Sequence, residues 1–230
     1  MNTEIKDGID TDQCVTQGAI APLRLWNRVD KSIATVIFAH GAGAPMDSDF
    51  MQEMAELLAK QGLSVVRFEF PYMAERRATG KKRPPNVQKV LLETWREEVA
   101  LLRQQVAGPI VLAGKSMGGR MASLLADELN ASALVCLGYP FYAAGKPEKP
   151  RVEHLATLQT PTLVVQGERD ALGNRLAVEG YTLSPAIEVH WIKTADHDLK
   201  PLKSSGLRHD EALQAAANAV GGFVRQTLGV

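Results

Sequence analysis

Cysteine, net charge and long apolar runs are all scarce in this chain of 230 residues. Only two cysteines are present, Cys14 and Cys136, and the apolar run around Cys136 favours a buried thiol that packs as a small hydrophobe over a disulfide or a nucleophile. The 26 Lys and Arg balance the 26 Asp and Glu, so net charge attracts neither nucleic acid nor an anionic membrane. No apolar run approaches the length of a membrane span, and the polar segment 1–14 lacks the apolar core of a secretory signal. We therefore expect a cytoplasmic protein with no nucleic-acid or membrane partner.

The rest of the composition, 45% hydrophobic and 23% charged, is typical of globular proteins. No repeat or linker divides the chain, which predicts one domain over residues 1–230. Short runs rich in Val, Ile, Leu and Phe predict strands at residues 34–39, 64–70, 110–113, 133–137, 162–165 and 187–192. Within the N-terminal segment 1–30, residues 22–29 are the candidate for an edge strand.

Between these runs, apolar residues recur with helical spacing. The predicted helices cover residues 50–60, 87–106, 116–129 and 208–228. Strands that are apolar throughout are typical of a sheet covered on both faces, and strand–helix alternation favours parallel strands. The sequence therefore predicts an α/β fold, with a mostly parallel twisted sheet between two layers of helices.

The stretch IVLAGKSMGG, residues 110–119, allows two interpretations. Gly-Lys-Ser suggests a phosphate-binding loop, but that motif needs four residues between its first glycine and Gly114, whereas five follow Gly108. Those five residues include the predicted strand, so they cannot form a loop that wraps a phosphate. Gly114-Lys-Ser116-Met-Gly118 instead fits a nucleophile elbow, in which a strand turns sharply into a helix and the residues two before and two after the serine must be small. We therefore predict Ser116 as a nucleophile.

A serine nucleophile needs a histidine base and an orienting acid, which in this arrangement follow in the order acid, then histidine. Asp170 follows the strand at 162–165 and His197 follows the strand at 187–192, so we predict these two as the acid and the base. Glu168 is the alternative acid. The other histidines (His40, His154, His190 and His209) do not lie on the loop after the last strand. Asp196 and Asp198 beside the base are interpreted as solvated or tuning charges.

An oxyanion hole would complete such a site. One donor is predicted to be the backbone N–H of Met117, the residue after the nucleophile. The second is predicted on the small-residue turn after the strand at 34–39, with Ala42 as the first choice and Gly43 as the alternative. His40 would then fix this loop. No His, Cys or Asp cluster has metal-ligand spacing, so we expect no metal and no cofactor.

Several segments together make the chain resemble the α/β-hydrolase fold from about residue 33 onward. They read FAHGAGAPMDS, RFEFPYMAERRATGKKRPP, AGKSMGGRMAS, LGYPFYAAGKPE and GERDALG. More narrowly, the chain is similar to a poorly characterised hydrolase-like branch that includes testis-expressed and chromatin-complex-associated relatives. The resemblance implies triad roles for Ser116, Asp170 and His197. Tyr142 departs from it, because some relatives are expected to carry histidine there.

The sequence also indicates what surrounds the site. Only about two dozen residues separate the strands at 133–137 and 162–165, too few for a large lid domain, which predicts an open site. Tyr139, Phe141 and Tyr142 follow the first of these strands and are predicted to contact substrate. The basic segment 76–83 is predicted as a loop that is either solvated or attracts an anion. Lys115 is interpreted as a helix-end or surface charge, or else as a substrate contact.

Two hypotheses follow. The first is a serine hydrolase that cleaves a carboxylic ester or related acyl bond of a small-molecule substrate. The second is a binding or scaffolding protein that retains the fold without significant turnover, since access and geometry are not readable from sequence.

Overall fold

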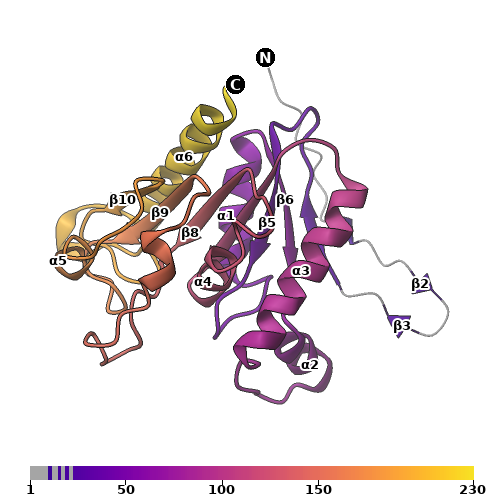
Figure 1. Cartoon of the computed structure of the whole chain (residues 1–230), viewed down its shortest axis with the longest axis horizontal. Helices are drawn as coiled ribbons and strands as arrows, with labels where there is room; N and C mark the ends of the chain where they lie inside the picture. The colour runs from indigo at the N-terminus through magenta and orange to yellow at the C-terminus, as the bar shows by residue number, and fades with distance from the viewer. Residues whose placement is uncertain (1–9, 12–14, 17–18, 21–22) are drawn as a thin grey trace.

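The computed structural model describes residues 10–11, 15–16, 19–20 and 23–230. The sequence predictions for residues 1–9, Cys14 and Pro22 lie outside the described residues. Within them, strands and helices alternate as predicted (Figure 1).

A single large sheet forms the centre of the structure, with strand order β1-β4-β6-β5-β7-β8-β9-β10. Its strands are β1 (Asp10–Thr11), β4 (Leu25–Asn27), β5 (Ala34–Ala39), β6 (Leu63–Phe68), β7 (Ile110–Lys115), β8 (Ala133–Leu137), β9 (Thr162–Gly167) and β10 (Ile187–Ile192). The strands from β5 to β10 pair in parallel, whereas β1 and β4 are antiparallel to their neighbours. Two further strands, β2 (Val15–Thr16) and β3 (Ala19–Ile20), form a separate two-stranded antiparallel sheet.

Helices cover both faces of this sheet (Figure 1). They are α1 (Asp49–Lys60), α2 (Pro71–Thr79), α3 (Gln88–Gln105), α4 (Met117–Ser123), α5 (Arg175–Val178) and α6 (His209–Leu228), with short 3₁₀ turns η1 (Glu153–Ala156) and η2 (Lys203–Ser205). One apolar core lies under α1 and α6, and the other lies under α2, α3 and α4. Strands β5 to β9 are buried on both faces for this reason, whereas β10 is only half-buried at the edge of the sheet. The α/β fold with a mostly parallel sheet is therefore confirmed.

Three local predictions were wrong. Residues 76–79 of the predicted basic loop are helical, because they form the end of α2. Pro71 occupies the first turn of this helix, and Gly80, with φ 69°, ends it in the left-handed conformation. Helix α4 stops at Ser123 instead of residue 129, where the Ser123 hydroxyl donates to a carbonyl of its own last turn. The predicted edge strand exists as β4, but β1 pairs with its outer side.

The connection between β8 and β9 contains turns and the one-turn helix η1, so these residues form no lid domain. Among residues 10–11, 15–16, 19–20 and 23–230, no helix is long and apolar enough to cross a membrane.

Candidate active site

Ser116 occupies the turn between β7 and α4, at the carboxyl edge of the sheet. Its backbone has φ 52° and ψ −116°, a strained conformation that costs a non-glycine residue about 1–3 kcal/mol. The turn closes because its glycines leave room for it. A Cβ on Gly114 would lie 2.1 Å from the Gly119 nitrogen, and a Cβ on Gly118 would lie 2.6 Å from the His40 carbonyl oxygen. The structure thus has the geometry that the Gly-x-Ser-x-Gly pattern predicts.

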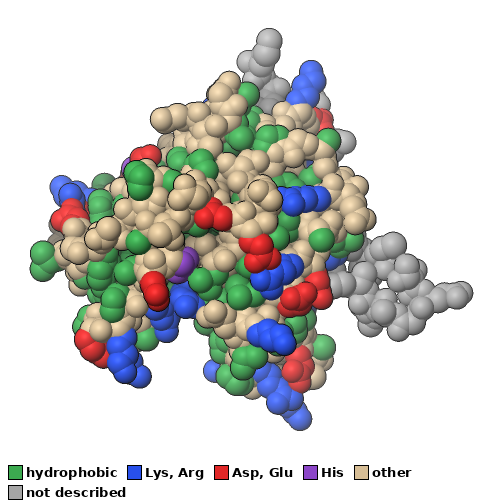
Figure 2. Space-filling view, viewed as in Figure 1, with side chains coloured by type: hydrophobic (Ala, Val, Ile, Leu, Met, Phe, Trp, Pro, Cys, Tyr) green, Lys and Arg blue, Asp and Glu red, His purple; other side chains and the backbone are tan. Residues whose placement is uncertain are grey.

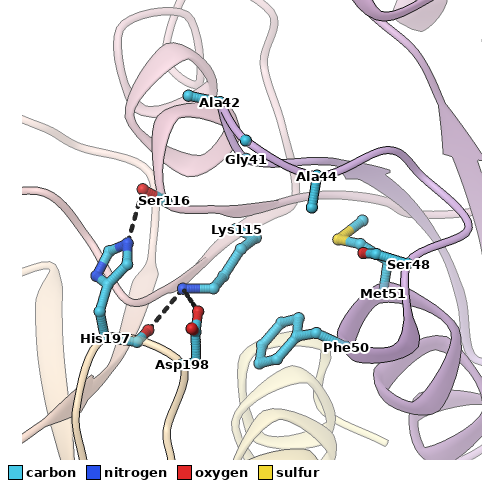
Figure 3. A pocket seen from close by; sticks show the side chains of 11 residues that line it. Gly41, Ala42, Ala44, Ser48, Phe50, Met51, Lys115, Ser116, His197 and Asp198 are labelled. Carbon is cyan, nitrogen blue, oxygen red and sulfur yellow. Dashed lines mark hydrogen bonds and ion pairs between the residues drawn. The ribbon is translucent and has the colours of Figure 1, made fainter. Parts of the chain in front are cut away.

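The structure brings Ser116, His197 and Asp170 into one hydrogen-bonded line. The distance between Ser116 Oγ and His197 Nε2 is 2.9 Å, and His197 Nδ1 lies 2.8 Å from Asp170 Oδ2 (Figure 3 draws the first contact). Asp170 follows β9 and His197 follows β10, so the parallel pairing of these strands places the two loops side by side. Because an ionised carboxylate only accepts hydrogen bonds, His197 Nδ1 carries a proton and Nε2 is left to accept from the serine hydroxyl.

Asp170 itself is fully buried and held by further donors. The Leu172 amide donates to Oδ1 at 2.7 Å, and Gln166 Nε2 donates to Oδ2 at 2.9 Å. The alternative acid, Glu168, does not reach His197. Its carboxylate accepts from the Thr194 amide at 2.8 Å, which lowers its pKa, and pairs at its other oxygen with an arginine.

Gln166 is a part of the site that sequence reasoning missed. Its side chain is fully buried, and Oε1 accepts from the Tyr139 amide at 2.7 Å while Nε2 lies within hydrogen-bond distance of Asp170, the Tyr139 carbonyl and the Gly173 carbonyl. It thereby ties the loop after β8 to the loop that carries Asp170. The only signal in the sequence is a polar residue at the end of an apolar strand, which does not say what it binds.

Of the competing histidines, two are held in other networks. The Phe70 amide donates to His40 Nε2 at 3.1 Å, so His40 Nδ1 carries the proton and donates to the Gly41 carbonyl at 2.6 Å. Burial lowers the pKa of His40, which keeps the ring neutral. His209 Nε2 contacts the carbonyl of Asp198. His190 lies within β10.

Ser123 and His154 form a second serine–histidine contact, with Ser123 Oγ 2.8 Å from His154 Nε2. Among residues 23–230, no carboxylate forms an ion pair or hydrogen bond with His154. Ser123 is 2% exposed within α4, and its hydroxyl also donates to the Arg120 carbonyl at 2.8 Å. Burial, reinforced by Arg120, lowers the pKa of His154 to about 4. This pair lacks both the acid and the access that a nucleophile needs.

The predicted oxyanion donors lie next to Ser116. Ala42, Ser116 and Met117 line the same cleft, and the Ala42 and Met117 amides donate to no acceptor within residues 23–230. The Tyr72 hydroxyl lies 3.2 Å from the Gly41 carbonyl and 3.0 Å from the Ala42 carbonyl. These contacts hold the carbonyl groups of the loop, and the Ala42 amide stays available to a ligand.

Lys115 is not a surface charge, because its side chain is only 9% exposed. Its Nζ donates to the His197 carbonyl at 2.5 Å and pairs with Asp198 Oδ1 at 3.1 Å, as Figure 3 shows. Burial lowers the pKa of Lys115, and Asp198 partly offsets that effect. The same loop is tightened by Asp196, whose Oδ1 accepts two amides of the turn. Lys115 therefore fixes the loop that carries His197.

Two clefts meet at Ser116. The first cleft, of about 370 Å³, is lined by Gly41–Ala44, Ser48, Phe50, Met51, Lys115, Ser116, His197 and Asp198 (Figure 3). The second cleft, of about 450 Å³, is lined by Ala42, Pro85, Asn86, Gln88, Leu91, Ser116, Met117, Arg120, Met121, Pro140, Tyr142–Ala144, Arg151 and Leu172. Among the described residues, no group of three or more His, Cys, Asp or Glu side chains could hold a metal ion.

Only one of the three predicted aromatic contacts lines these clefts. Tyr142 lies on the wall of the second cleft. Tyr139 and Phe141 do not, because both are fully buried and pack edge-on against each other with ring centroids 4.8 Å apart. Cys136 is a buried free thiol, as predicted.

The basic segment is partly neutralised within the chain. Arg77 forms ion pairs with Asp47 at 2.8 Å and with Glu69 at 2.6 Å, and Arg83 pairs with a carboxylate of α2. Both carboxylates raise the pKa of Arg77. These arginines are therefore engaged in ion pairs of their own.

Comparisons with known proteins agree with this architecture. A family model described as an alpha/beta hydrolase domain matches residues 32–225. No curated protein sequence gives a significant match. A lidless α/β serine hydrolase from Xanthomonas campestris superposes with a TM-score of 0.70 at 20% identity, covering 98% of this chain and 97% of that one.

Two further solved structures superpose on this chain to a similar extent. Dienelactone hydrolase from Anabaena variabilis gives a TM-score of 0.69 at 21% identity, covering 95% of this chain and 98% of that one. An esterase from Pyrococcus furiosus gives a TM-score of 0.68 at 20% identity, covering 96% of this chain and 93% of that one. At such low identity, these structures establish the likeness of fold alone. Because the family model spans most of the sequence, the chain belongs to the α/β-hydrolase family.

Proposed function

We propose that the protein is a serine hydrolase that cleaves a carboxylic ester or related acyl bond of a small molecule. Ser116 is the nucleophile, His197 the general base and Asp170 the acid that orients it. The observation that carries this proposal is the unbroken hydrogen-bonded line from Asp170 through His197 to Ser116. It gives the hydroxyl a proton acceptor and gives the imidazole a fixed tautomer.

In the first half of the reaction, Ser116 Oγ attacks the acyl carbon while His197 Nε2 takes the hydroxyl proton. Buried Asp170 stabilises the imidazolium that forms. The oxygen of the tetrahedral intermediate becomes negative and accepts from the free amides of Ala42 and Met117. Each such donor contributes about 3–4 kcal/mol to the stability of the transition state.

In the second half, His197 returns the proton to the departing oxygen, and the alcohol leaves behind an acyl group on Ser116. His197 then takes a proton from water, whose oxygen attacks the same acyl carbon through the same oxyanion site. When this intermediate collapses, His197 returns the proton to Ser116 Oγ, which releases the carboxylic acid and regenerates the serine. Side chains and backbone amides carry every step, so the mechanism uses no metal or cofactor.

The first cleft suits a short acyl chain. Its volume of about 370 Å³ is at the small end for ligand pockets, and Ala44, Phe50 and Met51 give it an apolar wall. The short connection after β8 leaves the entrance without a lid domain. The narrower resemblance to the testis-expressed and chromatin-complex-associated branch rests on sequence motifs alone and adds no substrate.

A fluorophosphonate probe followed by peptide mapping tests this proposal. We expect labelling at Ser116 that is abolished by Ser116→Ala and strongly reduced by His197→Ala. Ser123→Ala is the matched control, because it removes the other serine in contact with a histidine, and it should label like the wild type. Folded protein that takes no label at Ser116 would contradict the proposal and favour a non-catalytic binding or scaffolding protein.

A further inference from the structure

The second cleft carries positive charge without a counterion. Arg120 and Arg151 line it, and none of its lining residues is Asp or Glu. Within residues 23–230, neither guanidinium forms an ion pair with a carboxylate, whereas Arg77 and Arg96 each pair with carboxylates of the chain. The second cleft is therefore lined by two guanidinium groups that no carboxylate of the described residues neutralises.

Arg120 is the better fixed of the two. It lies one turn after the nucleophile, and its amide donates to the Ser116 carbonyl at 3.0 Å. The guanidinium makes one long contact, 3.4 Å from Nη1 to the Gln88 side chain. Its Nε is buried with no hydrogen-bond partner within residues 23–230, which costs free energy.

Arg151 lines the same cleft and belongs to the connection between β8 and β9. Its amide donates to the Phe141 carbonyl and its carbonyl accepts from the Tyr139 hydroxyl at 3.1 Å, so the backbone is fixed while the side chain stays exposed. Burial lowers the pKa of Arg120, and the neighbouring charge of Arg151 lowers it further. A bound anion would reduce the electrostatic repulsion between these two positive charges.

We propose that the second cleft binds an anionic group of the substrate, a carboxylate or a phosphate, held by Arg120 and Arg151 beside the acyl bond that Ser116 attacks. Guanidinium groups bind both of these oxyanions through paired, charge-assisted hydrogen bonds. Lys and Arg side chains, together with Asp and Glu side chains, lie on both sides of the indentation at the lower edge of the molecule, near α2 and the loop after β8 (Figure 2). This inference rests on the proposed hydrolase function and names a class of substrate for it.

Matched esters test the inference. We would compare 4-nitrophenyl hydrogen glutarate, which carries its charge on the acyl group, with its methyl ester. We would also compare 4-carboxyphenyl butyrate, which carries its charge on the leaving group, with its methyl ester. We expect kcat/KM to favour the anionic member of at least one pair. Arg120→Met should reduce that preference about ten- to hundredfold, the loss typical of a charge-assisted hydrogen bond.

Arg151→Met should reduce the same preference and decides the question if Arg120→Met does not fold. Arg103→Met is the matched control, because it removes an equal charge from an exposed position outside the second cleft and should leave the preference unchanged. Equal preference in the wild type, Arg120→Met and Arg151→Met would overturn the inference, even if every ester is hydrolysed.

Binding to Ser116→Ala separates this inference from the proposed function. We expect monomethyl glutarate or methyl phosphate to bind by calorimetry, weakened at least tenfold when Arg120→Met is added, and the stronger of the two probes identifies the oxyanion. If Ser116→Ala binds a probe through Arg120 but the wild-type protein turns over none of the esters, the hydrolase is refuted and the anion site stands. Failure of both probes to bind would refute the anion site.

Discussion

Replacing Asp170 by Asn tests the role of the buried carboxylate, because the change preserves shape and alters only hydrogen-bonding capacity. All three contacts of the carboxylate are with donors: the Leu172 amide at Oδ1, and Gln166 Nε2 and His197 Nδ1 at Oδ2. An asparagine offers one acceptor and one donor, so it must present its NH₂ group to a donor whichever way it is turned.

Both orientations impair the base. With NH₂ at the Oδ2 position, His197 keeps its hydrogen bond only by moving its proton to Nε2, which can then no longer accept from Ser116. With NH₂ at the Oδ1 position, the Leu172 bond is lost and no negative charge remains to stabilise the imidazolium. A lost charge-assisted bond costs about 1.5–3 kcal/mol, and the wrong tautomer adds to it. We therefore expect kcat/KM for an activated ester to fall about 10³–10⁴-fold, or about 4–5.5 kcal/mol.

Steady-state hydrolysis of 4-nitrophenyl butyrate measures this effect, with thermal unfolding as the check that the variant is folded. Glu168→Gln is the matched control, since it makes the same carboxylate-to-amide change two residues earlier. Its carboxylate is paired with an arginine near the surface, so we expect a change of less than about threefold. If Asp170→Asn retains a tenth of the wild-type rate, or if Glu168→Gln is the more damaging change, the assignment of the acid is wrong.

Three further predictions concern the supports of the site and stability. Gly118→Ala places a Cβ 2.6 Å from the His40 carbonyl oxygen, where only backbone could move, so we expect a lower Tm and loss of probe labelling at the elbow; wild-type labelling would contradict this. Lys115→Met removes the donor to the His197 carbonyl, and urea unfolding should show a loss of about 1.5–3 kcal/mol together with a lower kcat; an unchanged kcat would mean that this lysine does not position the base. His154 has a pKa of about 4 when folded against 6.5 ordinarily, so the unfolded state binds more protons between these values and stability falls as pH drops through this window. The full difference in the pKa of His154 corresponds to about 3 kcal/mol of unfolding free energy, which the partial exposure of the ring reduces to about 1–2 kcal/mol. Unfolding of His154→Asn from pH 7 to pH 4 should show a shallower loss than the wild type, and an equal loss would contradict the assignment.

The parts of the site that the sequence predicts depend on local rules, namely the steric limits of a tight turn and the position of a residue after a strand. Gly114, Ser116 and Gly118 fall within five residues, and steric limits on a tight turn act at that range, so the elbow was readable as a pattern. Asp170 and His197 are distant in sequence, but each follows a parallel strand, and the carboxyl ends of neighbouring parallel strands meet at one edge of a sheet. The position of each residue after a parallel strand was therefore enough to predict that Asp170 and His197 lie close together.

What the sequence could not predict depends on contacts across the fold. Gln166 is one polar residue after an apolar strand, and its importance appears only when the Tyr139 backbone and the Asp170 side chain converge on it. Lys115 looks like a surface charge until the His197 loop covers it. Tyr139 follows a strand, which is where residues of the cleft are expected, yet its ring packs into the core. Sequence position does not determine to which side of a loop a ring turns.

The most direct test of the central claim is the detection of a covalent acyl-enzyme. The protein would be mixed with excess 4-nitrophenyl butyrate, quenched in acid during the first turnover and digested for peptide mass mapping. We predict a butyryl group on Ser116 that forms with a burst of nitrophenol and is absent from Ser116→Ala and greatly diminished in His197→Ala. Ester turnover by the wild type with no acyl group on Ser116, or with the group on another residue, would contradict the account.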